Sequence, residues 1–227
     1  MPDNSKTLTH QQSTQFYDAL GAKQDWQAFF EVPSMRDLIA HANLETALAV
    51  VEFGCGTGTF AEQVLSHHLS PQATYLALDS SATMVRLTQP RLARFGERVQ
   101  VRQTDGSFKV SEPSDSCDRV VSNYLLDLLS PADMARLLTE ADRLLAPDGS
   151  LCLISITRGT TPLPRLLTWL WTQLHAVEPR LLGGCRPLEL CDYIPTMRWR
   201  MDYTQVITRF GIPSEVVVAT KQSGANV

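Results

Sequence analysis

The feature that most constrains the fold of this 227-residue chain is a glycine-rich loop in its first third. Residues 48–53 (Leu-Ala-Val-Val-Glu-Phe) form a short apolar run that leads directly into Gly54, Gly56 and Gly58. A run of this length that ends in glycines is typical of a buried parallel strand. Residues 59–67 then have the apolar spacing of a helix. Strand, glycine turn and helix in this order predict the start of a nucleotide-binding α/β fold.

An acidic residue stands where such a fold binds the ribose of a nucleotide. Asp79 ends the next apolar run, residues 74–78, and a carboxylate there is placed to accept hydrogen bonds from two ribose hydroxyls. The glycine spacing is G-x-G-x-G, because Thr59 stands where the dinucleotide fingerprint G-x-G-x-x-G requires its third glycine. An NAD-dependent oxidoreductase is therefore disfavoured.

Apolar runs and helical patterns alternate along the rest of the chain. We expect further strands at residues 99–102, 117–122 and 150–157, helices up to residues 92, 145 and 176 with N-caps at Ser80 or Ser81 and at Ser130, and an antiparallel hairpin of residues 199–208 and 214–220. The helical pattern of residues 16–43 is broken at Pro33. This order predicts one doubly wound α/β domain, in which residues 1–45 form a helical cap and residues 46–227 the ligand-binding domain.

The glycine loop, preceded by Glu52, resembles the first motif of the class I S-adenosylmethionine-dependent methyltransferases, in their type 11/25-like domain. Four other segments resemble parts of that family in the same order: residues 75–79 its second strand, residues 104–106 its adenine-contacting loop, residues 117–123 its fourth strand and residues 141–151 the helix, turn and fifth strand that follow. The resemblance implies a mostly parallel seven-stranded sheet with a C-terminal antiparallel hairpin, and S-adenosylmethionine as the cofactor.

The resemblance also implies a set of cofactor-binding residues. Asp79 and Ser80 would contact the ribose, Asp105 and Gly106 the adenine, and Glu52 and the Asn123 backbone carbonyl the amino group of the methionine moiety. The glycine loop itself would contribute Gly54, Cys55, Gly56 and Gly58. Packing alone is the alternative for the glycines, helix capping for Asp79, and an ordinary surface position for Glu52 and Asp105.

The class of methyl acceptor is predicted from a motif that the chain lacks and from its net charge. Residues 122–125 (Ser-Asn-Tyr-Leu) differ from the Asn/Asp-Pro-Pro-Tyr/Phe motif of methyltransferases that act on planar amino groups, and the net charge of −4 argues against a nucleic-acid partner. We therefore expect methyl transfer to an oxygen or nitrogen atom of a small, partly apolar molecule. The alternative is a non-catalytic S-adenosylmethionine-binding scaffold or regulatory subunit.

Candidate residues on the acceptor side follow the strands or precede the first one. Asp127 is a candidate general base, and Tyr17 is a candidate to close over the cofactor, with plain packing as the alternative. Tyr124, Arg158 and Arg186 are candidates for substrate contact, although surface positions are the alternative for the two arginines. No catalytic triad is needed, because a sulfonium-bound methyl group is already electrophilic.

The remaining features predict a cytoplasmic protein, monomeric or homodimeric, that is not stably inserted in a membrane. No signal peptide is visible, and the five cysteines are scattered without a C-x-x-C or Cys/His cluster, so we expect neither a disulfide framework nor a metal site. An apolar stripe at helical spacing (Leu163, Leu166, Leu167, Leu170, Trp171 and Leu174) is expected to be core or a lid, with membrane contact or a dimer seam as the alternative.

Overall fold

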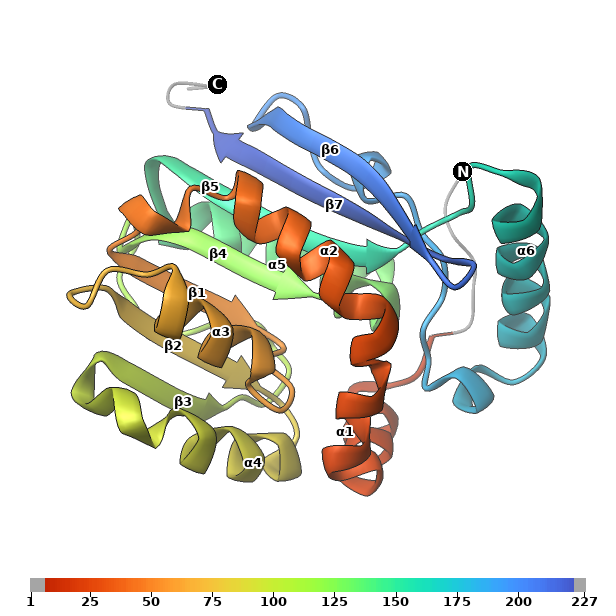
Figure 1. Ribbon diagram of the computed structural model, residues 1–227, viewed down its shortest axis with the longest axis horizontal. Helices are drawn as coiled ribbons and strands as arrows, with labels where there is room; N and C mark the ends of the chain where they lie inside the picture. The colour runs from red at the N-terminus through yellow and green to blue at the C-terminus, as the bar shows by residue number, and fades with distance from the viewer. Residues whose placement is uncertain (1–6, 223–227) are drawn as a thin grey trace.

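The computed structural model describes residues 7–222, with only the backbone described at residues 26–28 and 181. Its centre is a seven-stranded sheet in the order β3-β2-β1-β4-β5-β7-β6 (Figure 1). The strands are β1 (Ala49–Phe53), β2 (Thr74–Asp79), β3 (Val99–Gln103), β4 (Cys117–Asn123), β5 (Leu145–Ile156), β6 (Trp199–Arg209) and β7 (Ile212–Lys221). The first five pair in parallel, and β7 is antiparallel to both β5 and β6. The predicted mostly parallel sheet with a terminal hairpin is confirmed.

Helices cover both faces of this sheet. Helices α2 (Ala28–His41), α3 (Thr59–His67) and α4 (Ala82–Leu92) lie on one face, and α5 (Pro131–Leu144) lies on the other (Figure 1). Alternate strand residues face the two layers: Val50 packs in the cluster with α2 and α3, whereas Val51 packs in the cluster with α5. This alternation explains why the parallel strands are almost continuously apolar.

The helix starts follow the predicted capping chemistry. The Ser81 hydroxyl accepts a hydrogen bond from the Met84 amide at 3.1 Å, and the Ser130 hydroxyl accepts one from the Asp133 amide at 3.2 Å. Side-chain caps of this kind satisfy amides that have no partner within the helix. Of the two serines proposed for α4, Ser81 is thus the cap, and Ser130 caps α5 as predicted.

The N-terminal helical region is divided differently from the prediction. Helix α1 (His10–Leu20) ends at Gly21, whose φ of 53° ends the helix, and a 3-10 helix (Gly21–Gln27) leads into α2. Pro33 lies inside α2 without ending it. The predicted break at Pro33 is therefore wrong, because the glycine rather than the proline changes the direction of the chain.

Two helices lie outside the main layers. Helix α1 stands at the edge of the sheet to which the parallel strands point, and α6 (Pro162–Val177) stands apart beside the tip of the β6–β7 hairpin (Figure 1). The leucines of α6 are exposed, so the expectation that its apolar stripe is core is wrong. Within residues 7–222, no helix combines the length and apolar character needed to cross a bilayer.

Candidate functional site

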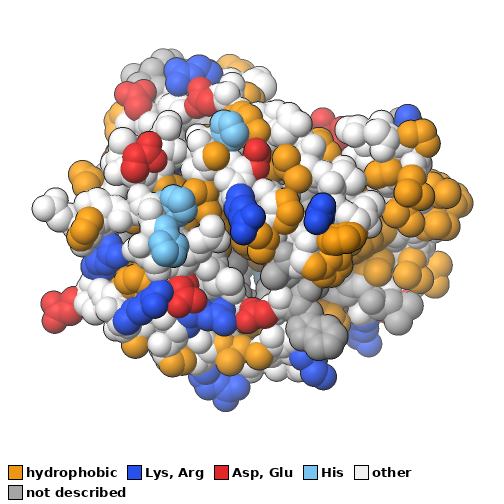
Figure 2. Space-filling view, in the orientation of Figure 1, with side chains coloured by type: hydrophobic (Ala, Val, Ile, Leu, Met, Phe, Trp, Pro, Cys, Tyr) orange, Lys and Arg blue, Asp and Glu red, His pale blue; other side chains and the backbone are white. Residues whose placement is uncertain are grey.

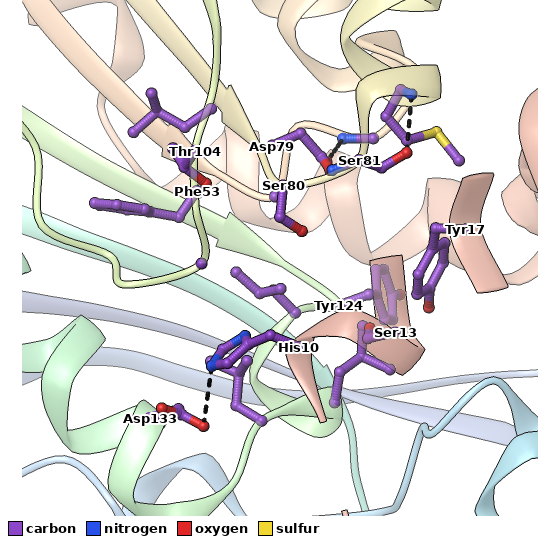
Figure 3. Close-up of a pocket in the computed structure, with 18 of the residues that line it drawn as sticks. His10, Ser13, Tyr17, Phe53, Asp79, Ser80, Ser81, Thr104, Tyr124 and Asp133 are labelled. Atoms are coloured by element: carbon purple, nitrogen blue, oxygen red, sulfur yellow. Dashed lines mark hydrogen bonds and ion pairs between the residues drawn. The ribbon is translucent and has the colours of Figure 1, made fainter. Parts of the chain in front are cut away.

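A cleft opens at the edge of the sheet where the parallel strands end. Its empty space, including the part open to solvent, is about 890 Å³. Loops after β1 to β4 form its floor and α1 covers it. Its lining includes His10, Ser13, Tyr17, Gly54, Gly56, Asp79, Ser80, Thr104, Gly106, Phe108, Asn123 and Tyr124 (Figure 3).

The Asp79 carboxylate organises the floor of this first cavity. One of its oxygens accepts a hydrogen bond from the Gly56 amide at 2.9 Å, and the other accepts one from the Ser81 amide at the same distance. A carboxylate has about four acceptor sites, so two backbone donors leave capacity for a ligand's hydroxyl groups. Burial raises the pKa of Asp79 to about 6, against the effect of these amide hydrogen bonds.

The glycine loop is shaped by side chains that press against it. Gly56 has a φ of 53°, and a Cβ atom there would lie 3.0 Å from the side-chain nitrogen Nε2 of Gln24. Gly58 has a φ of 80°, and its Cβ would lie only 2.7 Å from the Thr88 methyl group. The Thr88 hydroxyl also donates a hydrogen bond to the Gly56 carbonyl at 2.7 Å. Gly58 therefore requires glycine for conformation and for space, and Gly56 requires it for conformation.

Helix α1 closes the first cavity from the opposite side. The His10 ring contacts Asp133 of α5, with 3.3 Å between Nε2 and Oδ2 (Figure 3). Tyr17 also lines the cavity, and its hydroxyl lies 3.9 Å from the Cys185 sulfur. Burial raises the pKa of Tyr17 well above its ordinary value, and the neighbouring Cys185 and Asp127 raise it further.

A second cavity, of about 770 Å³ including its open part, adjoins the first. The two share five lining residues: Gln24, Gly54, Gly56, Asn123 and Tyr124. The second cavity is lined in addition by Asp25, Glu31, Val32, Met35, Glu52, Cys55, Thr57, Thr59, Phe60 and Gln63. A ligand in the first cavity would therefore contact a ligand in the second cavity beside the glycine loop and the end of β4.

Unpaired polar atoms mark the junction of the cavities. The Asn123 side chain is 9% exposed, and neither its amide nitrogen nor its oxygen has a hydrogen-bond partner among the described residues. The side-chain oxygen of Gln24 is buried and lacks a partner in the same way. A buried polar group left without a partner costs about 1–3 kcal/mol, so these atoms are suited to contact a ligand.

Acidic side chains give the second cavity its electrostatic character. Glu52 is buried and accepts a hydrogen bond from the Tyr75 hydroxyl at 2.9 Å, and burial raises its pKa to about 8. Burial, together with the charges of Asp127 and Asp25, raises the pKa of Glu31 to about 8 as well. Asp25 is held by Arg91, with 3.0 Å between the charged atoms. The cavity thus favours positive charge or a transferable proton.

Three of these lining residues were not anticipated from the sequence. Gln24, Asp25 and Glu31 belong to the N-terminal helical region, where they form no motif with each other or with the glycine loop. The sequence showed only that they are polar residues in a segment expected to cover the site. Only the packing of α2 and its preceding turn over the loop brings them to the cavity.

Two of the predicted acceptor-side residues, Asp127 and Arg186, are buried and line neither cavity. Asp127 is fully buried and lines neither cavity, and its carboxylate oxygens have no hydrogen-bond partner among the described residues. Its backbone carbonyl accepts hydrogen bonds from the amide of buried Arg186 at 3.1 Å and from that arginine's Nη1 at 3.3 Å. Burial raises the pKa of Asp127 to about 7.

The other predicted residues divide between the cavities and the surface. The cofactor candidates Gly54, Gly56, Asp79, Ser80, Gly106 and Asn123 line the first cavity, Glu52 and Cys55 line the second, and Gly58 packs against Thr88. Tyr124 lines both and donates a hydrogen bond to Ser214 at 3.0 Å. Asp105 is exposed and binds the Ser107 amide at 2.8 Å, and Arg158 is 74% exposed beside Glu189. The functional roles of all these residues stay predictions.

Comparison with known proteins gives a family match in the centre of the chain. Residues 50–149 match the family model described as a methyltransferase domain. The trans-aconitate 2-methyltransferase of Azoarcus sp. (strain BH72) is 31% identical over 132 residues, which cover 58% of this chain and 48% of that protein. The tRNA N(3)-methylcytidine methyltransferase Mettl2 of Drosophila melanogaster is 26% identical over 126 residues, covering 54% of this chain and 39% of that protein.

A solved structure extends the likeness of fold to almost the whole chain. The Burkholderia thailandensis 1,6-didemethyltoxoflavin-N1-methyltransferase, with its substrate and S-adenosylhomocysteine bound, superposes with a TM-score of 0.70 at 16% identity, over 98% of this chain and 94% of that one. At this identity the likeness concerns the fold alone. The matched segments span about half or less of the two curated relatives, whose names describe acceptors of very different chemistry.

Proposed function

We propose that this chain, which belongs to the class I S-adenosylmethionine-dependent methyltransferases, transfers a methyl group to an oxygen or nitrogen atom of a small, partly apolar molecule. The observation that carries the proposal is the meeting of two cavities at Asn123, whose buried side-chain amide has no hydrogen-bond partner among the residues that the structure describes. One cavity suits a nucleoside, and the other suits an acceptor beside it.

The residues of the first cavity fit S-adenosylmethionine. Asp79 has acceptor capacity left for ribose hydroxyls, and Thr104, Gly106 and Phe108 form an adjacent wall for a flat base. Gly54 and Gly56 leave room for a ligand against the backbone. When bound, S-adenosylmethionine supplies a methyl group on a positively charged sulfur, which makes that carbon electrophilic.

The chain's own contribution is mainly to hold two reactants in line and to exclude water. Well-oriented reactants gain about 7–11 kcal/mol relative to the same groups free in solution. Helix α1 covers the first cavity through His10 and Tyr17, and Tyr124 lines the wall shared with the second. These residues would restrict both the motion of the bound molecules and the access of solvent.

The second cavity supports an acceptor with both apolar and polar parts. Val32, Met35 and Phe60 provide apolar wall, and Glu31 and Glu52 provide carboxyl groups. A carboxyl whose pKa lies near the working pH is suited to take a proton from a hydroxyl or an ammonium group. Glu31, with its pKa raised to about 8, joins Asp127 as a candidate for this role.

We infer a small acceptor rather than a nucleic acid from the charge of the site. The second cavity is lined by three acidic residues and, among the residues that the structure describes, by no Lys or Arg. A phosphate backbone is bound by basic surfaces, which this cavity does not offer. A scaffold protein without catalysis would not need an open second cavity beside the nucleoside site.

A structure with S-adenosylhomocysteine bound, combined with methyl-transfer assays, tests the proposal. We expect the ribose on Asp79 and open space of the second cavity beside the sulfur atom. Transfer of labelled methyl to members of a panel of small alcohols, carboxylic acids and amines should then follow. Protein side chains filling the space beside the sulfur, or labelling of RNA in place of every small molecule, would overturn it.

A further inference from the structure

Helix α6 is packed with its apolar side facing outward. The residues that it buries are Pro164, Thr168 and His175, which are not strongly apolar. Its leucines lie on the other side, and Leu163 is 63% exposed. A helix on a globular core normally directs its leucines inward, because burial of a leucine contributes about 1.5–3 kcal/mol.

Hydrogen bonds on the inner side fix this orientation. Trp171 donates its indole hydrogen to the Cys185 carbonyl at 2.9 Å, and the ring of His175 lies 3.1 Å from the Gly184 carbonyl oxygen. The Thr168 hydroxyl accepts a hydrogen bond from the Gly159 amide at 3.3 Å. Rotating the helix to bury its leucines would break all three contacts, so the outward apolar side belongs to the folded state.

The exposed apolar surface continues onto the tip of the β6–β7 hairpin. Leu167 reaches Gly211, where an added Cβ would lie 2.6 Å from it, and the neighbouring Phe210 is 66% exposed. The Phe210 ring lies 5.5 Å from that of Phe29, which is also exposed. We name this surface the α6 face; its residues are Leu163, Leu166, Leu167, Trp169, Leu170, Leu174, Val177, Phe210 and Phe29. Figure 2 shows apolar side chains gathered over α6.

The charges around the α6 face are mainly positive, although the chain as a whole has a net charge of −4. Helix α6 contains no Asp or Glu. Exposed Arg165 lies on it, Arg180 follows it and Arg209 lies at the hairpin tip, whereas Glu178 is the acid that adjoins the helix end. An apolar helix side flanked by arginines and containing tryptophan is typical of helices that lie in a membrane interface.

We propose that the α6 face binds the surface of a lipid bilayer that contains anionic lipids. The leucines and Phe210 would enter the acyl boundary, and Arg165, Arg180 and Arg209 would meet the lipid phosphates. A second copy of the chain fits less well, because an isologous dimer apposes the same patch twice and would bring these arginines together. This proposal is independent of the methyl-transfer activity.

Flotation of the full chain with lipid vesicles tests this proposal. Vesicles of phosphatidylcholine mixed with phosphatidylglycerol should carry the protein upward, and the fluorescence of exposed Trp169 should shift to shorter wavelength on binding. The double substitution Leu166→Glu and Leu170→Glu should lower the partition coefficient by about tenfold or more. It replaces two leucines that would enter the bilayer by charges that anionic lipids repel. Raised salt should weaken the binding of the unaltered chain.

A matched control separates the apolar contact from a general effect of charge. The substitutions Gln72→Glu and Gln89→Glu add the same two negative charges at exposed positions outside the α6 face, and should leave most of the binding intact. Absence of flotation with the mixed vesicles at low salt would overturn the proposal. So would a dimer that dissociates on Leu166→Glu and Leu170→Glu while the unaltered chain ignores vesicles.

Discussion

The Asp79 carboxylate and the Gly56 backbone amide are 2.9 Å apart and join the end of β2 to the loop that follows β1. Both residues line the first cavity. One carboxylate therefore has two tasks, because it sets the conformation of the glycine loop and also offers acceptor sites to a ligand. The same pairing explains how a buried acid is kept at a position where its pKa is raised to about 6.

Replacing Asp79 should weaken cofactor binding. A pair of hydrogen bonds to a charged acceptor is worth about 1.5–3 kcal/mol, so Asp79→Ala should raise the Kd of S-adenosylhomocysteine by about tenfold or more. Calorimetric titration measures this change. Glu97→Ala, at an exposed position outside both cavities, is the control and should bind as the unaltered chain does. An unchanged Kd for Asp79→Ala would remove Asp79 from the binding site.

Asn123 and its neighbour Ser122 should respond in opposite ways to truncation. The Asn123 side-chain amide has no partner within the described part of the chain, so Asn123→Ala should change the free energy of unfolding little while lowering kcat/KM by about tenfold, the loss expected of one ligand hydrogen bond. Ser122 donates a hydrogen bond to the Phe53 carbonyl at 3.1 Å, so Ser122→Ala should cost about 1 kcal/mol of stability. Urea unfolding and turnover, measured on both variants, check the contrast. Large destabilisation by Asn123→Ala would contradict it.

Gly58 should be costly to replace for two separate reasons, conformation and space. It lies in the left-handed helical region, with φ 80° and ψ 14°, and a Cβ there would lie only 2.7 Å from the Thr88 methyl group. Gly58→Ala should cost about 1–2 kcal/mol for conformation and about 1–3 kcal/mol more for the overlap. Thr88→Ser removes that methyl group, so it should recover part of the loss in the double variant. An equal cost of Gly58→Ala in the unaltered chain and in Thr88→Ser, measured by urea unfolding, would show that the overlap has no effect.

Glu31 should make the ligand-free protein less stable as pH rises. Its pKa is raised to about 8 in the folded chain, from an ordinary value of 4.5, by burial and by the facing charges of Asp127 and Asp25. The folded state therefore holds a proton that the unfolded state releases. The contribution of Glu31 to the free energy of unfolding is therefore fully present below pH 4.5 and decreases as the pH rises to about 8. Glu31→Gln should remove this share of the fall, so its advantage over the unaltered chain should grow from pH 5 to pH 8. Parallel stability curves would contradict the prediction.

Local patterns predicted the fold well where local chemistry decides it. The strand before Gly54, the Ser130 cap and the terminal hairpin depend on short stretches whose periodicity and capping residues have one consistent interpretation. The break assigned to Pro33 is wrong because α2 continues through the proline, whereas Gly21 ended α1 through its backbone conformation. Nothing in the local pattern of α6 reveals that its polar contacts with residues 184 and 185 turn its leucines outward.

The residues of the candidate site differ in the same way: some follow from local sequence patterns and others only from packing. The glycine loop and Asp79 were found because each sits at a fixed place after a strand, and the fold brings those places together. Glu31 and Gln24 reach the cavities only through the packing of α2 and the turn before it, which no spacing in the sequence encodes. Asp127 was correctly placed near the end of β4, but its depth behind the cavity wall depends on how residues 185 and 186 cover it.

A calorimetric titration of the unaltered chain shows whether the first cavity binds S-adenosylmethionine. S-adenosylmethionine and S-adenosylhomocysteine should each bind with one site per chain, and NAD should give no saturable heat, because Thr59 replaces the glycine of the dinucleotide fingerprint. Saturable binding of NAD with no binding of either S-adenosyl compound would rule out the assignment of this cavity to S-adenosylmethionine.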